Sequence, residues 1–361
     1  MSGQEIRRIY RTARDEDLPL SLKLMIGDQV FEYSKVQWRV EGRMRGLRYG
    51  TNPHQKAALY RPKQSKGGIG KVDWVKWGKD GPSATNIEDG SHGLRIVSYF
   101  REPAVAVMKH LNPSGVSVSQ GKESLSQVYA RARDADNRAA FGSVVVFNSP
   151  VDRKTAEEIM KSFVEVVYAP GYGSKALGIF ESKKDIRVGE VPARHKEDTA
   201  MPPDVVVLDD GSLIIEDPYR TRILSMDDVK RLPVPTKKKP SDQEYLGLLH
   251  AWWMACEVRS NAVVFWKNGT SRAIGTGQQD RIGAIENSID KARKLGQGLV
   301  GSVMASDGFL PKLDNVEALV KENVSAIVQP GGSVEDEAII KACDEHGIKM
   351  VLTEERSFRH F

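Results

Sequence analysis

The stretch Val105-Ala-Val-Met-Lys-His-Leu-Asn-Pro-Ser-Gly115 joins an apolar run to a polar turn sequence and is the most informative part of the chain. The apolar run starts at Ala104 and predicts a buried strand, whereas Asn112 to Gly115 predict a turn. Lys109 and His110 stand between the two, at a strand end, where open α/β sheets place their chemistry. Adjacent lysine and histidine side chains can share a proton transfer, so both are candidate catalytic residues. The alternative is a pair of solvent-exposed charges.

Helix-like and strand-like patterns alternate on both sides of this stretch. In the first half they predict helices over residues 87–100, 125–136 and 152–163, and strands over 104–109, 143–148 and 164–169. In the second half they predict helices over 245–258, 282–295, 316–322 and 335–346, and strands over 262–266, 273–275, 300–305, 326–329 and 349–353. The alternation predicts a layered α/β fold with a largely parallel sheet. Both halves share one rhythm, a long helix and then a strand ending in a polar cluster, which suggests an ancient duplication.

The same patterns divide the chain into four parts. Residues 1–46 are charged with little apolar periodicity, and we expect them to form an N-terminal helical arm that packs on the body or on a partner subunit. Residues 47–200 form the first predicted subdomain, and residues 243–361 form the second. The stretch between them is rich in Pro, Asp and Lys, so we expect residues 201–242 to be a connector.

Composition restricts the class of protein. With 361 residues, 40% of them hydrophobic and 28% charged, the chain has the composition of a globular protein with room for two domains. The net charge of +5 is dispersed rather than gathered into a basic stripe, so we expect no nucleic-acid partner. No apolar run approaches the roughly 18 residues of a membrane span, and the first residues lack an apolar signal core. Two cysteines, Cys256 and Cys343, are too few for a disulfide framework, which favours a reducing, cytoplasmic location.

Further motifs accompany the central stretch in a fixed order. They are Leu47-Arg-Tyr-Gly-Thr-Asn-Pro-His-Gln55, Phe141-Gly-Ser143, Ala169-Pro-Gly-Tyr172, Arg259-Ser-Asn-Ala262, Gly275-Thr-Gly-Gln-Gln279, Ala305-Ser-Asp-Gly-Phe-Leu-Pro311, Gln329-Pro-Gly-Gly-Ser333 and Glu355-Arg-Ser-Phe-Arg-His-Phe361. In this order and at these separations, the set resembles the AICAR transformylase domain of the bifunctional purine-biosynthesis family, from about Leu47 to the last residue. The resemblance implies two cytidine-deaminase-like α/β/α subdomains. It also implies a homodimer whose active sites lie at the interface.

The resemblance further implies formyl transfer from 10-formyltetrahydrofolate to the 5-amino group of AICAR, giving FAICAR and tetrahydrofolate in IMP biosynthesis. That amine is a weak nucleophile because its lone pair is delocalised, so the reaction needs positioning, a proton acceptor and stabilisation of the developing oxyanion. His110 matches the family's catalytic histidine, which would take the amine proton. The alternative is a structural histidine that holds the predicted turn at Asn112 to Gly115. Lys109 would stabilise the oxyanion or protonate the leaving nitrogen of the folate.

The resemblance assigns the other matched residues to binding. A guanidinium suits a phosphate because its planar fork bonds two oxygens at once, so Arg48 and Arg356 are the predicted phosphate partners. Asn261 would lie near the carboxamide of AICAR and the formyl group, although an asparagine here could also cap the start of a strand. Asp314 and Asn315 would contact the folate, but such a pair equally suits the N-cap of a helix. The predicted AICAR-binding residues are Arg48, Tyr49, Asn86, Gly142, Asn261, Phe309 and Arg356, and the predicted folate-binding residues are Asp307, Gly308, Asp314 and Asn315.

One segment departs from the family pattern. Where the family usually reads Leu-Ser-Tyr-Asn-Asn, this chain has Pro82-Ser-Ala-Thr-Asn86, in which only Ser83 and Asn86 match. Because that segment helps to hold the nucleotide, its change can alter affinity or preference. We find no stretch that resembles the family's cyclohydrolase domain, so we expect a stand-alone transformylase and ring closure to IMP by another protein.

Cofactors and rival functions depend on the same residues. A zinc deaminase needs a His or Cys with a nearby Glu and a Pro-Cys-x-x-Cys pair, and the sequence has neither, so we expect no metal ligands of that kind. A structural potassium ion, which the family can hold, stays an open alternative. The lack of a Walker loop argues against direct use of ATP.

Two rival functions also stay open: a non-catalytic paralogue that binds AICAR, and a formyltransferase that uses a different formyl donor.

Overall fold

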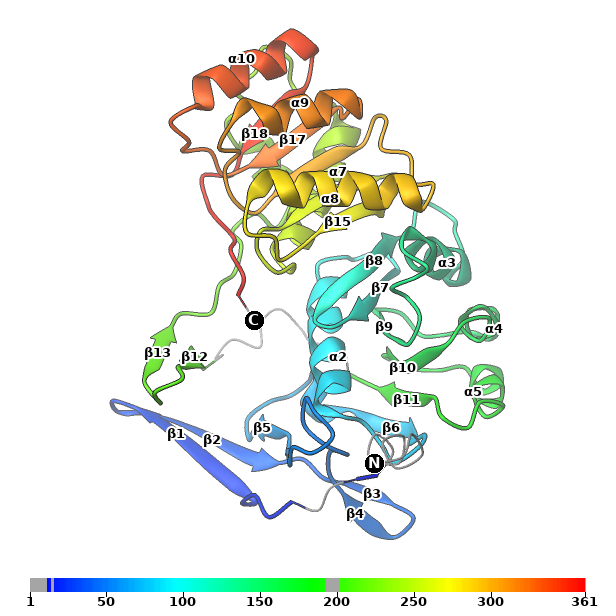
Figure 1. Ribbon diagram of the computed structural model, residues 1–361. Helices are drawn as coiled ribbons and strands as arrows, with labels where there is room; N and C mark the ends of the chain where they lie inside the picture. The colour runs from blue at the N-terminus through cyan, green and yellow to red at the C-terminus, as the bar shows by residue number, and fades with distance from the viewer. Residues whose placement is uncertain (1–11, 14–15, 193–201, 361) are drawn as a thin grey trace, which may run out of the picture.

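A mixed eleven-stranded sheet forms the centre of the computed structural model, which describes residues 12–13, 16–192 and 202–360 (Figure 1). In order across the sheet the strands are β18 (Lys349–Leu352), β17 (Ala326–Gln329), β16 (Val303–Ser306), β14 (Val263–Lys267), β15 (Thr270–Gly275), β8 (Asn112–Val118), β7 (Ala104–Lys109), β9 (Ser143–Phe147), β10 (Val164–Ala169), β11 (Arg187–Glu190) and β6 (Asp73–Lys76). Inner strands such as β9 are buried along their whole length, which suits a sheet that is covered on both faces.

The sheet consists of two halves with the same topology. Residues 84–190 contain helix α2 (Ala84–Val97), hairpin β7–β8, α3 (Leu125–Ala135), β9, α4 (Arg153–Ile159), β10, α5 (Ser174–Phe180) and β11. Residues 242–352 contain α7 (Asp242–Ala255), hairpin β14–β15, α8 (Arg281–Lys294), β16, α9 (Leu313–Lys321), β17, α10 (Asp336–His346) and β18. The second strand of each hairpin lies at the seam, where β8 pairs with β15 and joins the halves. The predicted α/β fold class with two similar α/β/α subdomains is confirmed, and the repeat is what a duplication would produce.

The prediction of a largely parallel sheet is wrong. Strands β9, β10 and β11 are parallel to one another, as are β16, β17 and β18. The strands of both hairpins, however, pair antiparallel with each other and with their neighbours β9 and β16. A tight hairpin turn reverses the chain, so its second strand must run against the first. The sequence pattern locates the strands but does not reveal the direction of neighbouring ones.

Helices cover both faces of the sheet. Helices α2 and α7 lie on one face, and their buried side chains form a single core across the seam that includes Ile96, Val97, Leu248 and Trp252. On the other face, α3, α4 and α5 pack over the first half and α8, α9 and α10 over the second, each set around its own core. The shared core makes the two halves one packed body.

The main helices begin where the sequence supplies caps. Ser241 and Glu244 form a capping box at the start of α7, in which each side chain accepts a hydrogen bond from the other residue's backbone N–H. Asp280 caps α8 by accepting a hydrogen bond of 2.6 Å from Gly283 N. Such caps satisfy backbone donors that the helix itself cannot pair.

The N-terminal region is built of strands rather than of a helix. Strands β1 (Ser21–Ile26), β2 (Gln29–Lys35) and β5 (Tyr60–Pro62) form a small antiparallel sheet, and β3 (Trp38–Val40) pairs with β4 (Arg43–Arg45). A short 3-10 helix η1 (Ile69–Lys71) precedes β6. The prediction of a helical arm over residues 1–46 is therefore wrong for its described part, while residues 1–11 and 14–15 lie outside the described residues. Strands β1 and β2 contain no fully buried residue, so their apolar alternation is weak.

A hairpin and a short helix lie between the halves. Strands β12 (Asp204–Val207) and β13 (Leu213–Glu216) pair antiparallel, and α6 (Met226–Arg231) follows. Every residue of β12 and β13 is exposed although most are apolar, and Figure 1 shows this hairpin standing clear of the large sheet. Within the described ranges, no helix is long and apolar enough to cross a membrane.

Candidate active site

Lys109 and His110 lie at the turn of hairpin β7–β8. Strand β7 ends at Lys109, His110 and Leu111 adopt left-handed backbone angles (φ 53° and 65°), and β8 begins at Asn112. The predicted turn at Asn112 to Gly115 is wrong, because this stretch already belongs to β8 and pairs with β7. The turn is shorter than predicted, and it leaves the His110 side chain exposed beside the partly buried Lys109.

The ammonium group of Lys109 is tied to Gly142, just before β9. Lys109 Nζ donates a hydrogen bond of 2.6 Å to the carbonyl O of Gly142. Gly142 has a φ of 68°, and a Cβ at this position would lie 3.1 Å from Lys109 Nζ and 3.3 Å from the Phe163 ring. Glycine therefore serves both the left-handed backbone and the close approach to the lysine.

The turn at His110 and Leu111 rests on helix α2. Leu111 N donates a hydrogen bond of 2.6 Å to Oδ1 of the buried Asp89, and the Leu111 backbone also contacts His92 one helical turn further on. Burial raises the pKa of Asp89 to about 6, against the opposing effect of the Leu111 N–H and of the neighbouring positive charges. Burial also lowers the pKa of His92 to about 4. Near neutral pH, Asp89 is therefore an anion and His92 is neutral.

Arg48 and Tyr49 lie against the N-terminus of α2. Arg48 N donates a hydrogen bond of 2.7 Å to Pro82 O, and Ala84 N donates one of 3.0 Å to Tyr49 O. Arg48 Nη2 donates a hydrogen bond of 3.0 Å to the Tyr49 hydroxyl, and its guanidinium carbon lies 4.6 Å from the centroid of the Tyr49 ring. Both side chains are buried, so the guanidinium group of Arg48 is held in a fixed position.

Ser83 and Asn86, the two matching residues of the divergent segment, form the capping box of α2. Ser83 N donates to Asn86 Oδ1 at 3.1 Å, and Asn86 N donates to Ser83 Oγ at 3.4 Å. Asn86 Nδ2 also donates a hydrogen bond of 3.2 Å to Glu165 Oε2. The residues that differ from the family pattern therefore leave the start of this helix intact.

A second buried arginine, Arg187 on β11, carries its charge near Arg48. Its Nε and Nη2 donate hydrogen bonds of 2.6 Å and 2.7 Å to the carbonyl oxygens of Gly81 and Lys79. Burial and the charge of Arg48 lower the pKa of Arg187 to about 10, and Glu165 opposes this effect. Two buried guanidinium groups this close together favour an anion beside them, and phosphate is a suitable one.

Asn112 links the hairpin turn to the second half of the molecule. Its Oδ1 accepts hydrogen bonds of 3.0 Å from Arg259 N and from Thr276 Oγ1. Asn261 lies in the same loop as Arg259, and its Nδ2 donates a hydrogen bond of 2.8 Å to Gln278 O. These contacts bring the Lys109–His110 turn and the Asn261 loop together across the seam.

Asp307 and Gly308 connect the Asn261 loop to the C-terminal segment. Ser260 Oγ donates a hydrogen bond of 2.6 Å to Asp307 Oδ2. A Cβ on Gly308 would lie 2.7 Å from the Phe358 ring, and the guanidinium carbon of Arg356 lies 4.3 Å from the centroid of that ring. Contacts through Ser260 and Phe358 therefore link Asp307, Gly308 and Arg356 to one another.

Three predicted ligand residues lie outside these contacts. Phe309 is 44% exposed in the loop after β16, and Asp314 and Asn315 belong to the first turn of α9. Asn315 Nδ2 donates hydrogen bonds to Lys312 O at 3.2 Å and to Asp314 Oδ1 at 2.5 Å. These hydrogen bonds stay within the start of α9 and do not bring the pair to Lys109.

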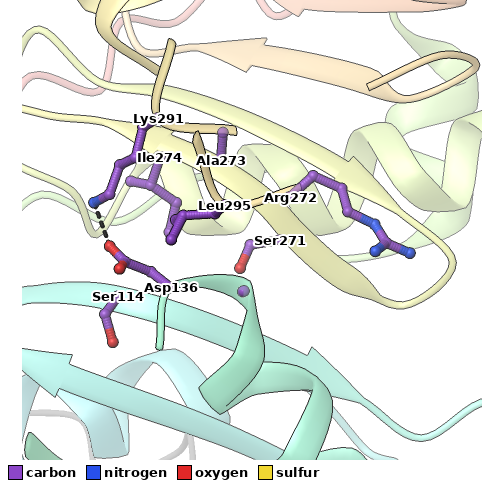
Figure 2. Close-up of a pocket in the computed structure, with 9 residues that line it drawn as sticks. Ser114, Asp136, Ser271, Arg272, Ala273, Ile274, Lys291 and Leu295 are labelled. Atoms are coloured by element: carbon purple, nitrogen blue, oxygen red, sulfur yellow. Dashed lines mark ion pairs between the residues drawn. The ribbon is translucent and has the colours of Figure 1, made fainter. Parts of the chain in front are cut away.

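The hollows near the seam are separate from the candidate site. Figure 2 shows a crevice at the seam in which Asp136 and Lys291 form an ion pair of 2.5 Å. Its volume of about 10 Å³ has room for one water molecule and not for a nucleotide. A cavity of about 370 Å³ lies at the far end of β14 and is lined in part by His250 and Trp266. None of the predicted site residues lines either hollow.

Metal ligands do not gather in the part of the chain that the structure describes. No group of three or more His, Cys, Asp or Glu side chains there could hold a metal ion. Cys256 and Cys343 are buried and unpaired with each other, and burial raises the pKa of each thiol.

Comparison with known proteins places the chain in a family. The model of the AICARFT/IMPCHase bienzyme family matches residues 14–291. The chain belongs to this family. The bifunctional purine biosynthesis protein PurH of Oceanobacillus iheyensis is 40% identical over 329 residues, which are 91% of this chain and 60% of that protein. Proteins of the same name from Aquifex aeolicus and Bacillus cereus are 38% and 37% identical, over 88% and 87% of this chain and 60% and 59% of their own length. The chain thus spans about 60% of the length of these curated relatives.

In this member of the AICARFT/IMPCHase family, the structure adds residues that the sequence motifs do not reveal. Arg281 forms a buried ion pair with Asp307 and donates a hydrogen bond of 3.1 Å to Ala262 O. Arg281 could have been predicted from the sequence, because it lies two residues after the Gly275 to Gln279 motif. Asp89 was also detectable, as a carboxylate on the buried face of a predicted helix. Nothing in the local sequence distinguishes Arg187.

Proposed function

We propose that this chain catalyses formyl transfer from 10-formyltetrahydrofolate to the 5-amino group of AICAR, giving FAICAR and tetrahydrofolate, as a step of purine biosynthesis. The observation that supports this best is the β7–β8 turn, where Lys109 is held at the carbonyl of Gly142 and His110 stands exposed beside it. The reaction needs a proton acceptor and a positive charge at one place, and the turn supplies both.

In the proposed reaction, the amine nitrogen of AICAR attacks the formyl carbon and forms a new C–N bond. The bond between the formyl carbon and the folate nitrogen then breaks. His110 takes the proton that the amine loses, and Lys109 stabilises the oxyanion or protonates the departing folate nitrogen. The Lys109 side chain is held before substrate binds by its hydrogen bond to Gly142 O, and His110 follows it directly in the turn.

The binding residues keep the roles that the family resemblance gives them. Arg48, with Arg187 behind it, would bind the nucleotide phosphate at the start of α2, because both guanidinium groups are buried there. Arg356 would be a second phosphate partner. The remaining proposed AICAR ligands are Tyr49, Asn86, Gly142, Asn261 and Phe309, and the proposed folate ligands are Asp307, Gly308, Asp314 and Asn315.

We also propose a homodimer with composite active sites at its interface. The exposed β12–β13 hairpin supports this, because a two-stranded ribbon with apolar residues in solvent is marginally stable on its own. Exposed apolar patches of this kind mark interaction sites. A partner would also account for a candidate site that lies on open surface in the single chain.

Three further predictions are retained without a structural test. They are the division into a subdomain over residues 47–200, a connector over residues 201–242 and a subdomain over residues 243–361, the cytoplasmic location and the structural potassium ion. Potassium addition in the assay below would test the last of these.

The experiment is tetrahydrofolate release, followed by absorbance, when purified protein meets AICAR and 10-formyltetrahydrofolate. A parallel reaction offers formate with ATP as the formyl donor. Release that depends on AICAR with the folate donor is the expected result. Activity with formate alone would instead identify a different donor, and AICAR binding without turnover in either reaction would identify a non-catalytic paralogue.

A further inference from the structure

We propose that Asp89 is a positioning residue for the transfer reaction, because its carboxylate holds the backbone of the turn that carries Lys109 and His110. This inference rests on the proposed function for its catalytic consequence. The contact itself is independent of that function.

The geometry at the turn supports this role. Leu111 N lies 2.6 Å from Asp89 Oδ1, and the His110 backbone N–H also reaches this carboxyl group. Two successive residues with left-handed angles turn their N–H groups toward one point and create a concave site for an anion. The carboxylate of Asp89 fills that site from within the protein.

Left-handed angles at His110 and Leu111 need external support. Residues with a Cβ avoid this backbone region, because the Cβ approaches the following carbonyl oxygen. Leu111 is not one of the residue types that adopt such angles more readily, which are glycine, asparagine, aspartate and histidine. The charge-assisted hydrogen bonds to Asp89 therefore compensate for a conformation that the local sequence does not favour.

Helix α2 is seated so that Asp89 can reach the turn. A Cβ on Gly90 would lie 2.4 Å from the Tyr168 ring, and a Cβ on Gly93 would lie 2.4 Å from Val146. The two glycines let the helix approach the sheet closely, and this brings Asp89 against the end of β7. Asp89 is only 6% exposed there, so water cannot readily replace its carboxylate as the acceptor.

A loosened turn should affect the chemical step more than nucleotide binding. The proposed phosphate partner Arg48 is held by Tyr49 and by the backbone of Pro82, and not by Asp89. Loss of the carboxylate would leave that contact in place and would release the orientation of Lys109 and His110. Small errors in the placement of reacting groups lower turnover by up to about 100-fold.

The test compares Asp89→Ala, Asp89→Asn and the control Glu88→Gln, which removes the adjacent exposed carboxylate of the same helix. We expect Asp89→Ala to lower kcat by about 10- to 100-fold with the KM for AICAR changed less than about 3-fold. Asp89→Asn keeps one oxygen acceptor and should recover part of the lost kcat. Glu88→Gln should match the wild type. Unchanged kcat in Asp89→Ala, or an equal effect of all three substitutions, would overturn the proposal.

Amide hydrogen exchange supplies a readout that does not need turnover. Exchange at Leu111 should accelerate by at least about 10-fold in Asp89→Ala, while exchange at Val107 in the centre of β7 stays the same. If the wild type lacks transferase activity, the proposed function fails and the exchange result alone decides whether Asp89 holds the turn. Equal protection of Leu111 in wild type and variant would show that it does not.

Discussion

Asn112 Oδ1 accepts a hydrogen bond of 3.0 Å from Arg259 N, so the first residue of β8, directly after the Lys109–His110 turn, is bound to the backbone of the opposite half. The same oxygen accepts from Thr276 Oγ1 at 3.0 Å. We expect Asn112→Ala to lower the free energy of unfolding by about 1–3 kcal/mol, because two donors lose their acceptor. It should also lower kcat, since the turn and the Asn261 loop would no longer be fixed together. Urea unfolding and steady-state kinetics measure both effects, and the exposed Asn137→Ala is the control.

His110 is the proposed proton acceptor. We expect His110→Ala to lower turnover by about 10²- to 10⁴-fold, the range for a lost acid–base group. Because the side chain is exposed, the far-UV circular dichroism spectrum and the unfolding midpoint should not change. His346→Ala, at an exposed histidine at the end of α10, should retain full turnover. Normal turnover in His110→Ala would remove this residue from the mechanism.

Gly142 allows a steric test at the lysine. In Gly142→Ala the new Cβ would lie 3.1 Å from Lys109 Nζ on a backbone with a φ of 68°. We expect a loss of about 1 kcal/mol in stability from the backbone alone and an additional fall in kcat from the displaced ammonium group. Gly121→Ala is the matched control, because its φ is 70° and nothing lies within 4 Å of the new Cβ. Equal kinetic effects of the two substitutions would show that the contact with Lys109 is unimportant.

Asp89 makes a specific contribution to the pH dependence of stability. Burial raises its pKa from the ordinary 3.8 to about 6 in the folded protein, with Lys109 and His110 on the turn and Tyr168 on β10 as the facing groups. The folded state therefore binds the proton of Asp89 more tightly than the unfolded state does. The resulting gain in the free energy of unfolding is present below about pH 4 and is lost as the pH rises to about 6. The loss is at most about 3 kcal/mol, and Asp89→Asn should abolish it. Urea unfolding from about pH 4 to pH 7 tests this, with the exposed Asp209→Asn expected to follow the wild type.

The β12–β13 hairpin allows a test of the homodimer. Val206 and Ile214 are paired across the hairpin and are 45% and 47% exposed, so a charge there should not disturb the fold of one chain. We expect Val206→Glu to weaken the dimer and to lower the specific activity at low protein concentration. Sedimentation velocity measures the first effect. Val334→Glu, at a fully exposed loop residue, should remain dimeric, and a dimer unaffected by Val206→Glu would exclude this hairpin from the interface.

Sequence patterns predicted most elements of the large sheet because its strands are buried. Val144 to Val146 and Val166 to Val167 are apolar without interruption, and helices with one apolar face separate them. The same reasoning failed for β1 and β2, because a ribbon without fully buried residues can carry almost any side chain. It also failed for strand direction, which depends on whether two strands join by a hairpin or by a crossover helix.

The candidate site was predictable only where its residues form local motifs. Lys109 and His110 were predicted from their place at a strand end, and Arg48 and Tyr49 from the family motif that contains both. The turn was misplaced because Asn-Pro-Ser-Gly is a strong local turn signal, whereas the actual turn depends on Asp89, which lies 22 residues away from Leu111. Arg187 acts through its proximity to Arg48 in the folded chain, and no local pattern encodes that proximity.

The pairing of β8 with β15 has a consequence for synthesis on the ribosome. Ser117 on β8 meets Thr270 on β15, a partner 153 residues further along the chain. The inner edge of the first half therefore stays unpaired while all of those residues are being translated, and closing so long a loop is slow. An unpaired strand edge is a template for aggregation. The nascent chain thus passes through a period in which its first half is exposed to mispairing, and that period ends only when the second hairpin leaves the exit tunnel.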